Sequence, residues 1–190
     1  MAAWPQVTYF SAGTETPDET DSPRRPQRRR RRERLQRIRT TAVSLVVAAC
    51  GVPVAKHGNR AASSKAGAAD TLEALGLDME RAGMLAEETL NELGICFLFA
   101  ANHHPAMKRI TPIRRRIGKR TIFNLMGPLA NPARVTRQLI GIARPDYAPV
   151  YAEALAQLGA EAAFVVAGAE GLDEMSGAGP TVVVPVGAAR

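Results

Sequence analysis

The chain has 190 residues, enough for one domain with a modest core, and is rich in aliphatic but poor in aromatic side chains. Its net charge of +7 is uneven, because residues 24–39 contain ten arginines and one glutamate and leave the rest at −2. The basicity is therefore local and does not mark the remaining chain as a nucleic-acid-binding domain. We expect no membrane-spanning helix, since no apolar run reaches 18 residues, and no secretory signal, because the N-terminus lacks a charged segment followed by an apolar one. Cys50 and Cys96 lie in apolar runs and are interpreted as buried thiols of a cytoplasmic protein.

The first 39 residues show no pattern of a folded element. Residues 1–21 are polar and aperiodic, whereas the arginine-rich segment 24–39 repels itself and stays solvated or binds polyanions. No aromatic side chain lies among these arginines to stack on bases, so sequence-specific recognition of nucleic acid has no support. We predict that residues 1–39 are disordered and that residues 40–190 form an α/β domain.

The pattern of residues 40–190 predicts alternating helices and strands. Thr40 and Thr41 cap an apolar helix over residues 42–50, Gly51 ends it, and a short apolar strand over 52–55 follows. Further helices are expected over 65–75, 84–93, 105–117 and 148–158, strands over 95–100, 138–142, 163–167 and 181–186, and loops over 101–104 and 120–132. This alternation predicts an α/β fold, a largely parallel sheet flanked by helices.

A polar turn, Lys56-His57-Gly58-Asn59-Arg60, follows the strand over 52–55, and Ser63 and Ser64 precede the next helix. A cation at a strand end, a glycine that admits a ligand, and hydroxyls with free amides at a helix start can bind a phosphorylated ligand. The alternative is an ordinary strand, turn and helix with a solvated basic turn.

Two adjacent acids, Asp173 and Glu174, follow the strand over 163–167. By themselves they indicate a solvated turn. Ligands of parallel α/β sheets collect beyond the carboxyl ends of the strands, so we expect this turn and the polar turn to open on one cleft. Beside a diphosphate, the two carboxylates could hold Mg²⁺.

The polar turn with Ser63-Ser64-Lys65, the segments Asn102-His103-His104-Pro105 and RTIFNLMGPLANP (residues 120–132), and Gly171-Leu172-Asp173-Glu174 occur in this order. Together they resemble anthranilate phosphoribosyltransferases over about residues 40–181. The resemblance implies a nucleoside phosphorylase/phosphoribosyltransferase-like α/β domain. It also implies transfer of the phosphoribosyl group of phosphoribosyl pyrophosphate (PRPP) to anthranilate, with release of pyrophosphate, in tryptophan biosynthesis.

The resemblance also assigns roles to individual residues. Those implied to bind PRPP are Thr40, Thr41, Lys56, His57, Gly58, Asn59, Arg60, Ser63 and Ser64. Those implied to bind anthranilate are Asn59 and Arg114, with His57 and His104 nearby, and those implied to hold Mg²⁺ are Asp173, Glu174 and Thr40. No nucleophile with an adjacent base is evident, so we expect positioning and electrostatic stabilisation rather than covalent catalysis.

The chain departs from the family pattern before residue 40. A Gly-Thr-Gly-Gly-Asp loop is expected near residues 28–32 and Asn-Ile-Ser-Thr on 38–41, but only Thr40 and Thr41 are present. We hypothesise that residues 1–39 are a frame-shifted reading, which translation of the other two frames would test. The family also has an N-terminal helical domain, further sheet beyond the acidic pair, and a homodimer. We therefore expect this partial domain to fold poorly and turn over little substrate.

Two other functions compete with this interpretation. One is a pyrimidine-nucleoside phosphorylase-like enzyme, whose signature would alter the residues around Asn59 and Arg114. The other is a non-catalytic basic protein that binds nucleic acid through Arg24–Arg39, which would show a steep salt dependence. The residues around Asn59 and Arg114 both match the anthranilate enzyme, which favours the transferase.

Overall fold

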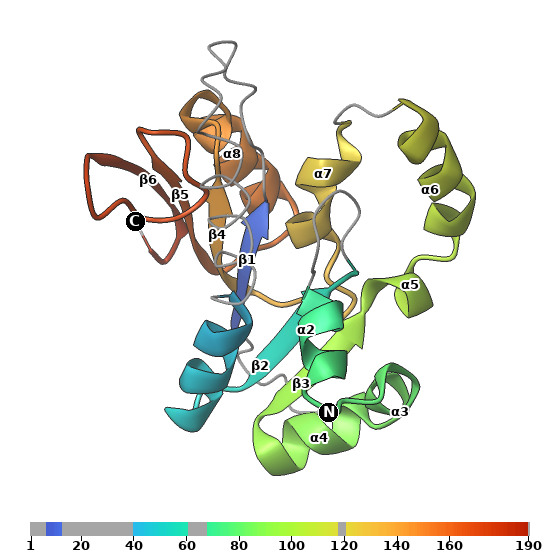
Figure 1. The fold of residues 1–190 in the computed structure, drawn as a ribbon. Helices are drawn as coiled ribbons and strands as arrows, with labels where there is room; N and C mark the ends of the chain where they lie inside the picture. Colours follow the sequence, from blue (N-terminus) through green and yellow to red (C-terminus); the bar gives the residue numbers. More distant parts are fainter. Residues whose placement is uncertain (1–6, 13–39, 61–67, 118–120, 190) are drawn as a thin grey trace. The chain divides into compact units, whose positions relative to one another are not determined.

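The computed structural model describes residues 7–12, 40–60, 68–117 and 121–189 (Figure 1). The chain divides into two compact units, one formed by residues 17–120 and the other by residues 121–190 together with 1–16. Each unit is described by itself.

The unit of residues 17–120 contains a pair of parallel strands with helices beside it. After a helix over residues 40–49, its elements are β2 (Val54–Gly58), α2 (Ala68–Ala74), α3 (Met79–Met84), α4 (Ala86–Leu93), β3 (Ile95–Phe99), α5 (Ala100–His103) and α6 (Ala106–Ile117). The strands β2 and β3 pair from Val54 opposite Ile95 to Gly58 opposite Phe99. Helices α2 and α3 pack on β3 through Ala69, Met79 and Phe97, in the green part of Figure 1.

The other unit is a four-stranded sheet covered on one face by a helix. Its elements are β1 (Val7–Ala12), α7 (Phe123–Met126), the 3-10 turns η1 (Gly127–Ala130) and η2 (Pro145–Tyr147), β4 (Arg137–Ile142), α8 (Ala148–Gln157), β5 (Ala162–Gly168) and β6 (Thr181–Gly187). The strands β1, β4 and β5 are parallel neighbours, and β6 adds antiparallel to β5. The fold is therefore α/β with a largely parallel sheet, as predicted.

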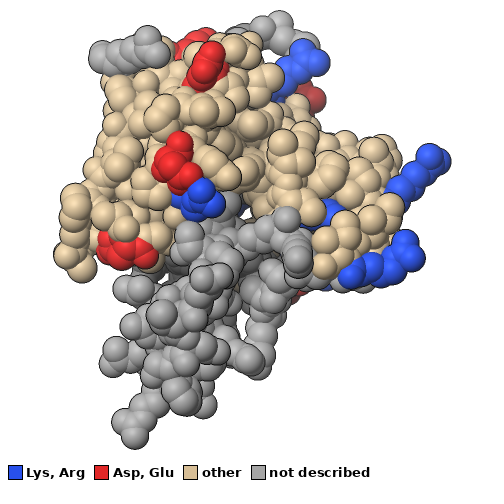
Figure 2. Space-filling model, turned by 90° about the horizontal axis from the view of Figure 1, so that it is seen from above, with Lys and Arg blue, Asp and Glu red and all other residues tan. Residues whose placement is uncertain are grey.

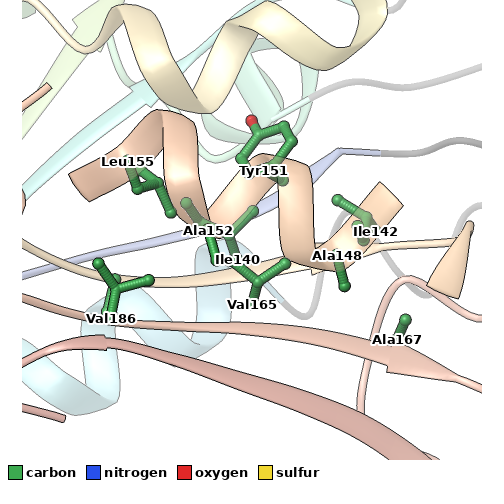
Figure 3. Packing of buried hydrophobic residues seen from close by; sticks show 10 residues of the cluster. Ile140, Ile142, Ala148, Tyr151, Ala152, Leu155, Val165, Ala167 and Val186 are labelled. Carbon is green, nitrogen blue, oxygen red and sulfur yellow. The ribbon is translucent and has the colours of Figure 1, made fainter. Parts of the chain in front are cut away.

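The core of this second unit lies between α8 and the sheet (Figure 3). Leu155 of α8 lies beside Ile140, Val165 and Val186 on three successive strands, and Tyr151 belongs to the same buried cluster. Burying each such aliphatic side chain contributes roughly 1.5–3 kcal/mol, so this contact dominates the stability of the unit. The Tyr151 hydroxyl also donates to the Leu125 carbonyl at 2.6 Å, which ties α7 to α8.

The opposite face of β5 and β6 remains partly uncovered. Because side chains alternate along a strand, Phe164 and Val183 point away from α8, and both are exposed. Large apolar side chains are also exposed on the helix over residues 40–49, where Val46 is an example. Apolar surface is thus exposed in both units among the described residues. No helix among those residues is both long and apolar enough to cross a bilayer.

The prediction that residues 1–39 are disordered is wrong over Val7–Ala12, which forms β1. This segment contains valine, threonine, tyrosine and phenylalanine, which favour strands, and β4 supplies its hydrogen-bonding partner. That partner lies far along the chain, so the local strand preference of this short segment did not decide its structure. The remainder of residues 1–39, including the arginine-rich segment and the proposed frame-shift, lies outside the described residues.

Several element boundaries also differ from the predictions. The expected loop over 101–104 is mostly α5, and the expected loop over 120–132 contains α7 and η1, because turn-forming residues also fit short helices. Cys96 is buried as predicted, but Cys50 is exposed, since the helix before it presents one side to solvent. Gly51 does end that helix, with a positive φ of 83°.

Candidate functional site

The strand-end segment, Lys56 to Arg60, begins inside β2 rather than in a turn. The predicted end of the strand at residue 55 is wrong, because β2 continues through Lys56 and His57 to Gly58. Pairing with β3 satisfies the backbone of these residues and lets the sheet bury their polar side chains. The segment therefore presents buried polar groups at the carboxyl end of a parallel strand, where ligands of α/β folds bind.

Lys56 is the buried cation of this segment. Its side chain is 4% exposed, and burial lowers its pKa from 10.5 to about 8. Taking an ammonium out of water disfavours the charged form, which is why the pKa falls. An anion bound beside it would restore the preference for the charged form, so this lysine is suited to a phosphate ligand.

The lowered pKa of Lys56 predicts a pH-dependent stability. Between the folded value of about 8 and the ordinary value of 10.5, the unfolded chain binds more protons, so the free energy of unfolding rises with pH. Burial raises the pKa of Cys96 from 9.0 to about 11, which opposes this rise above pH 9. Denaturant titrations at pH 7 to 9 should therefore show a rise of up to about 1 kcal/mol in wild type. Lys56→Met should remove that rise, and an unchanged pH dependence would contradict the assignment.

His57 and His104 form a direct pair in the same unit. Their Nε2 atoms lie 3.2 Å apart and their rings meet edge to face with centroids at 5.1 Å. In this hydrogen bond one Nε2 carries the proton and the other Nε2 accepts it. Two neutral rings would therefore be in different tautomers. His104 directly follows α5, and this short helix brings it to the end of β2. Two residues that the resemblance placed near the acceptor are thus in contact.

Asn59 and Arg60 leave the strand and are exposed. The Asn59 side-chain oxygen accepts from the Arg60 backbone N–H at 2.8 Å. The Arg60 guanidinium forms two 2.5 Å hydrogen bonds with Glu73 of α2 and lies 5.4 Å over the Phe99 ring. A phosphate at Arg60 would compete with this ion pair, whereas one at Lys56 would gain a buried cation.

The remaining residues assigned to PRPP and anthranilate are distributed along this unit. Thr40 and Thr41 are buried at the start of the helix over 40–49, where the Ser44 hydroxyl donates to the Thr40 carbonyl at 2.7 Å. Arg114 is half-buried on α6. Ser63 and Ser64 lie outside the described residues, so their assignment stays a prediction.

The acidic loop, residues 168–174, lies in the other unit at the end of β5. It folds back on the strand, because the Gly168 N–H donates to the Leu172 carbonyl at 2.9 Å. Gly171 takes a positive φ of 76° to make the turn, and its N–H donates to the Gly168 carbonyl at 3.0 Å. Asp173 is only 4% exposed, and Glu174 is half-buried. Asp173 and Glu174 therefore follow a hydrogen-bonded turn that folds back on β5.

The chain after the acidic loop supports it with further hydrogen bonds. The Ser176 hydroxyl accepts from the Ala178 and Gly179 N–H groups at 3.0 and 2.9 Å and donates to Glu170. The Ser176 N–H donates to the Thr181 hydroxyl at 2.8 Å. Together these bonds close the connection between β5 and β6 that follows the acidic pair.

The donor set fits Mg²⁺ that is shared with a ligand. Asp173 and Glu174 supply hard carboxylate oxygens, and no group of three acidic, histidine or cysteine side chains that could hold a metal occurs among the described residues. Mg²⁺ binds through one or two carboxylates when waters and phosphate oxygens complete its octahedron. Two adjacent carboxylates match that mode, and the Thr40 hydroxyl that the resemblance implied as a further ligand stays a prediction.

Figure 2 shows how charged side chains are distributed over one face of the described residues. On the face shown in Figure 2, blue and red side chains stand singly or in small groups between uncharged surface. An extended basic surface is therefore not evident among the described residues of that face. The arginine-rich segment 24–39 lies outside the described residues, so binding of nucleic acid through it stays untested.

A model of the glycosyl transferase family, a/b domain, matches residues 37–189. The chain belongs to this family. Its curated relatives include anthranilate phosphoribosyltransferase from Erythrobacter litoralis, 77% identical over 140 residues, which are 74% of this chain and 42% of the relative. Anthranilate phosphoribosyltransferase from Rhodospirillum rubrum is 55% identical over 144 residues, which are 76% of this chain and 42% of the relative. The chain thus spans less than half the length of these relatives.

Solved structures of this family have the same fold. Anthranilate phosphoribosyltransferase from Thermus thermophilus matches with a TM-score of 0.77 and 42% identity over 97% of this chain and 50% of its own. The Saccharomyces cerevisiae enzyme in complex with PRPP and Mg matches with a TM-score of 0.72 and 28% identity over 94% and 46%. These likenesses confirm the family fold inferred from the motifs.

Two residues of this family domain escaped the sequence reasoning. Ser176 closes the connection that follows the acidic pair, but a lone serine in a glycine-rich loop carries no distinctive signal. Gly141 lies inside β4 against the backbone of Asp173. A glycine within a strand pattern indicates a close backbone approach, and this signal could have identified it. That the strand-end segment and the acidic loop share one cleft stays a prediction.

Proposed function

We propose that this chain supplies the α/β part of an anthranilate phosphoribosyltransferase. The activity transfers the phosphoribosyl group of PRPP to anthranilate and releases pyrophosphate. The observation that carries the proposal is the strand-end segment, where the residues of a phosphate-binding motif occupy a buried strand end in a chain 77% identical to a relative of that name. The yeast enzyme, solved with PRPP and Mg, supports the same choice of ligands.

The buried groups of the two units have complementary roles in this proposal. Lys56 binds a phosphate of PRPP, with the hydroxyls of Thr40 and Thr41 as further donors. Asp173 and Glu174 would hold Mg²⁺, which would supply positive charge to balance that of the pyrophosphate group. The protein supplies no covalent step. Positioning of the amine against the ribose carbon and stabilisation of the leaving group account for catalysis.

The acceptor carries an amine and a carboxylate on a planar ring. Arg114 can pair the carboxylate through two parallel hydrogen bonds, and Asn59 can bind the amine. The pair of His57 and His104 lies beside this position in the proposal and contributes a donor or acceptor according to its tautomers.

Arg114→Gln should weaken anthranilate binding by roughly 10- to 100-fold, because a charge-assisted hydrogen bond is lost. Arg116→Gln is the matched control, since Arg116 is exposed on the same helix. Titration of anthranilate fluorescence with the chain, Mg²⁺ and pyrophosphate measures both. If both substitutions weaken anthranilate binding equally, Arg114 acts only through the positive charge of the helix surface and does not pair with the carboxylate.

The proposed function is tested with the purified chain, PRPP, Mg²⁺ and anthranilate. We expect saturable PRPP binding by calorimetry and slow or undetectable loss of anthranilate fluorescence, because the chain spans less than half of its relatives. Brisk turnover would contradict the expectation of weak activity but support the assignment. Absence of both PRPP binding and turnover would contradict the proposal, and salt-dependent oligonucleotide binding in its place would favour the nucleic-acid alternative.

The proposal extends to the complete protein as a cytoplasmic homodimer. Light scattering of the complete protein tests the dimer, and a monomer at all concentrations would overturn it.

A further inference from the structure

We propose that Gly141 of β4 is the positioning residue of the acidic loop. Its missing side chain leaves the space that the Asp173 backbone occupies. This inference rests on the proposed function, since it concerns the placement of the carboxylates that would hold Mg²⁺.

The contact between Gly141 and Asp173 is too close for any side chain. A Cβ added at Gly141 would lie 1.7 Å from the Asp173 carbonyl oxygen and 2.5 Å from its carbon. Real Cβ atoms essentially never come within 3.0 Å of such an atom. The backbones of residues 141 and 173 would therefore have to separate by about 1.3 Å to raise the distance from 1.7 to 3.0 Å. Both atoms belong to the main chain, so no side chain can rotate out of the way.

The strand is the less movable partner of this contact. Ile140 and Ile142, on either side of Gly141, are fully buried in the core beneath α8. Because side chains alternate, Gly141 faces the opposite side of the sheet, where the acidic loop lies. Its register opposite Ser11 of β1 and Val166 of β5 fixes the strand between two neighbours. A larger residue at position 141 would therefore displace the loop.

The loop would move with its carboxylates, because its own bonds make it a compact turn. The Gly168 N–H holds the Leu172 carbonyl at 2.9 Å, directly before Asp173. A Cβ at Gly168 would lie 3.2 Å from the Glu174 carbonyl, so the loop is also close-packed on this side. Loss of the contacts that orient metal ligands typically lowers metal affinity by about 10- to 100-fold.

The test compares Gly141→Ala with Gly177→Ala. Gly177 follows Ser176 in the same connection and has open space around its Cβ position, so its substitution controls for a glycine-to-alanine change. We expect Gly141→Ala to weaken PRPP binding in Mg²⁺ by about 10- to 100-fold and to leave the weaker metal-free binding unchanged. Gly177→Ala should change neither. Equal behaviour of both variants, or equal loss with and without Mg²⁺, would overturn the proposal.

A second pair of measurements does not require metal or activity. In the wild-type chain, a nuclear Overhauser contact should join the Gly141 α-proton to backbone protons of Asp173 or Glu174, and its absence would overturn the proposal even if Gly141→Ala fails to fold. In a folded Gly141→Ala chain, amide exchange should quicken in residues 168–174 while the core of β4 and β5 stays protected. If PRPP binding by wild type shows no Mg²⁺ dependence, the proposed function fails, while the contact itself remains measurable.

Discussion

Replacing Lys56 by methionine is expected to abolish stabilisation of the chain by PRPP and, at neutral pH, to make the unliganded chain more stable. The ammonium is 4% exposed and its pKa lies near 8, so at pH 7 the fold holds a desolvated charge. A pKa lowered by this amount corresponds to a cost on the order of 3 kcal/mol, part of which an apolar side chain of similar length recovers. We expect a gain of about 1–3 kcal/mol in the free energy of unfolding.

The same substitution removes the buried cation that the proposal places against a phosphate. Ligand at 1,000 times its dissociation constant stabilises a protein by about 4 kcal/mol, so thermal melts with and without PRPP and Mg²⁺ measure the loss directly. Arg81→Gln is the control, because it removes one exposed positive charge from α3 in the same unit. If PRPP stabilises Lys56→Met as strongly as wild type, the phosphate does not bind at Lys56.

Replacing Leu155 by alanine is expected to destabilise the second unit by about 2–5 kcal/mol. Leu155 is 1% exposed, and α8 presses it against Ile140 and Val186 (Figure 3). Removal of its methyl groups loses transfer free energy and leaves a cavity among side chains that pairing of the strands holds in place. A loss of this size is a large share of the stability of an ordinary domain.

Leu158→Ala provides the matched control for that prediction. Leu158 ends the same helix but is 64% exposed, so its truncation should change stability by less than about 0.5 kcal/mol. Chemical denaturation with amide exchange in β4 and β5 as a local readout separates this unit from the rest of the chain. Similar effects at both positions would mean that α8 does not pack on the sheet as described.

The sequence picks out the residues of the candidate site more readily than it predicts their burial and contacts. The motif around Lys56 and the pair of Asp173 and Glu174 stand out in the sequence because their residue types and order are distinctive. Burial of Lys56 inside a strand was not predicted, since a run of polar residues reads locally as a turn. The contact of His57 with His104 joins residues 47 positions apart, which no spacing rule relates.

The sequence by itself determined the α/β class and the elements whose patterns are strong. Apolar runs identified β3 and β5, and helix-forming residues closed by Gly159 identified α8, because burial and backbone preference act there in the same direction. Only the tertiary structure decided that Val7–Ala12 is a strand, that β2 continues to Gly58, and that the Asp173 backbone lies on Gly141. Each of these depends on a partner distant in the chain, which supplies hydrogen bonds or occupies space, and a local pattern carries no information about such a partner.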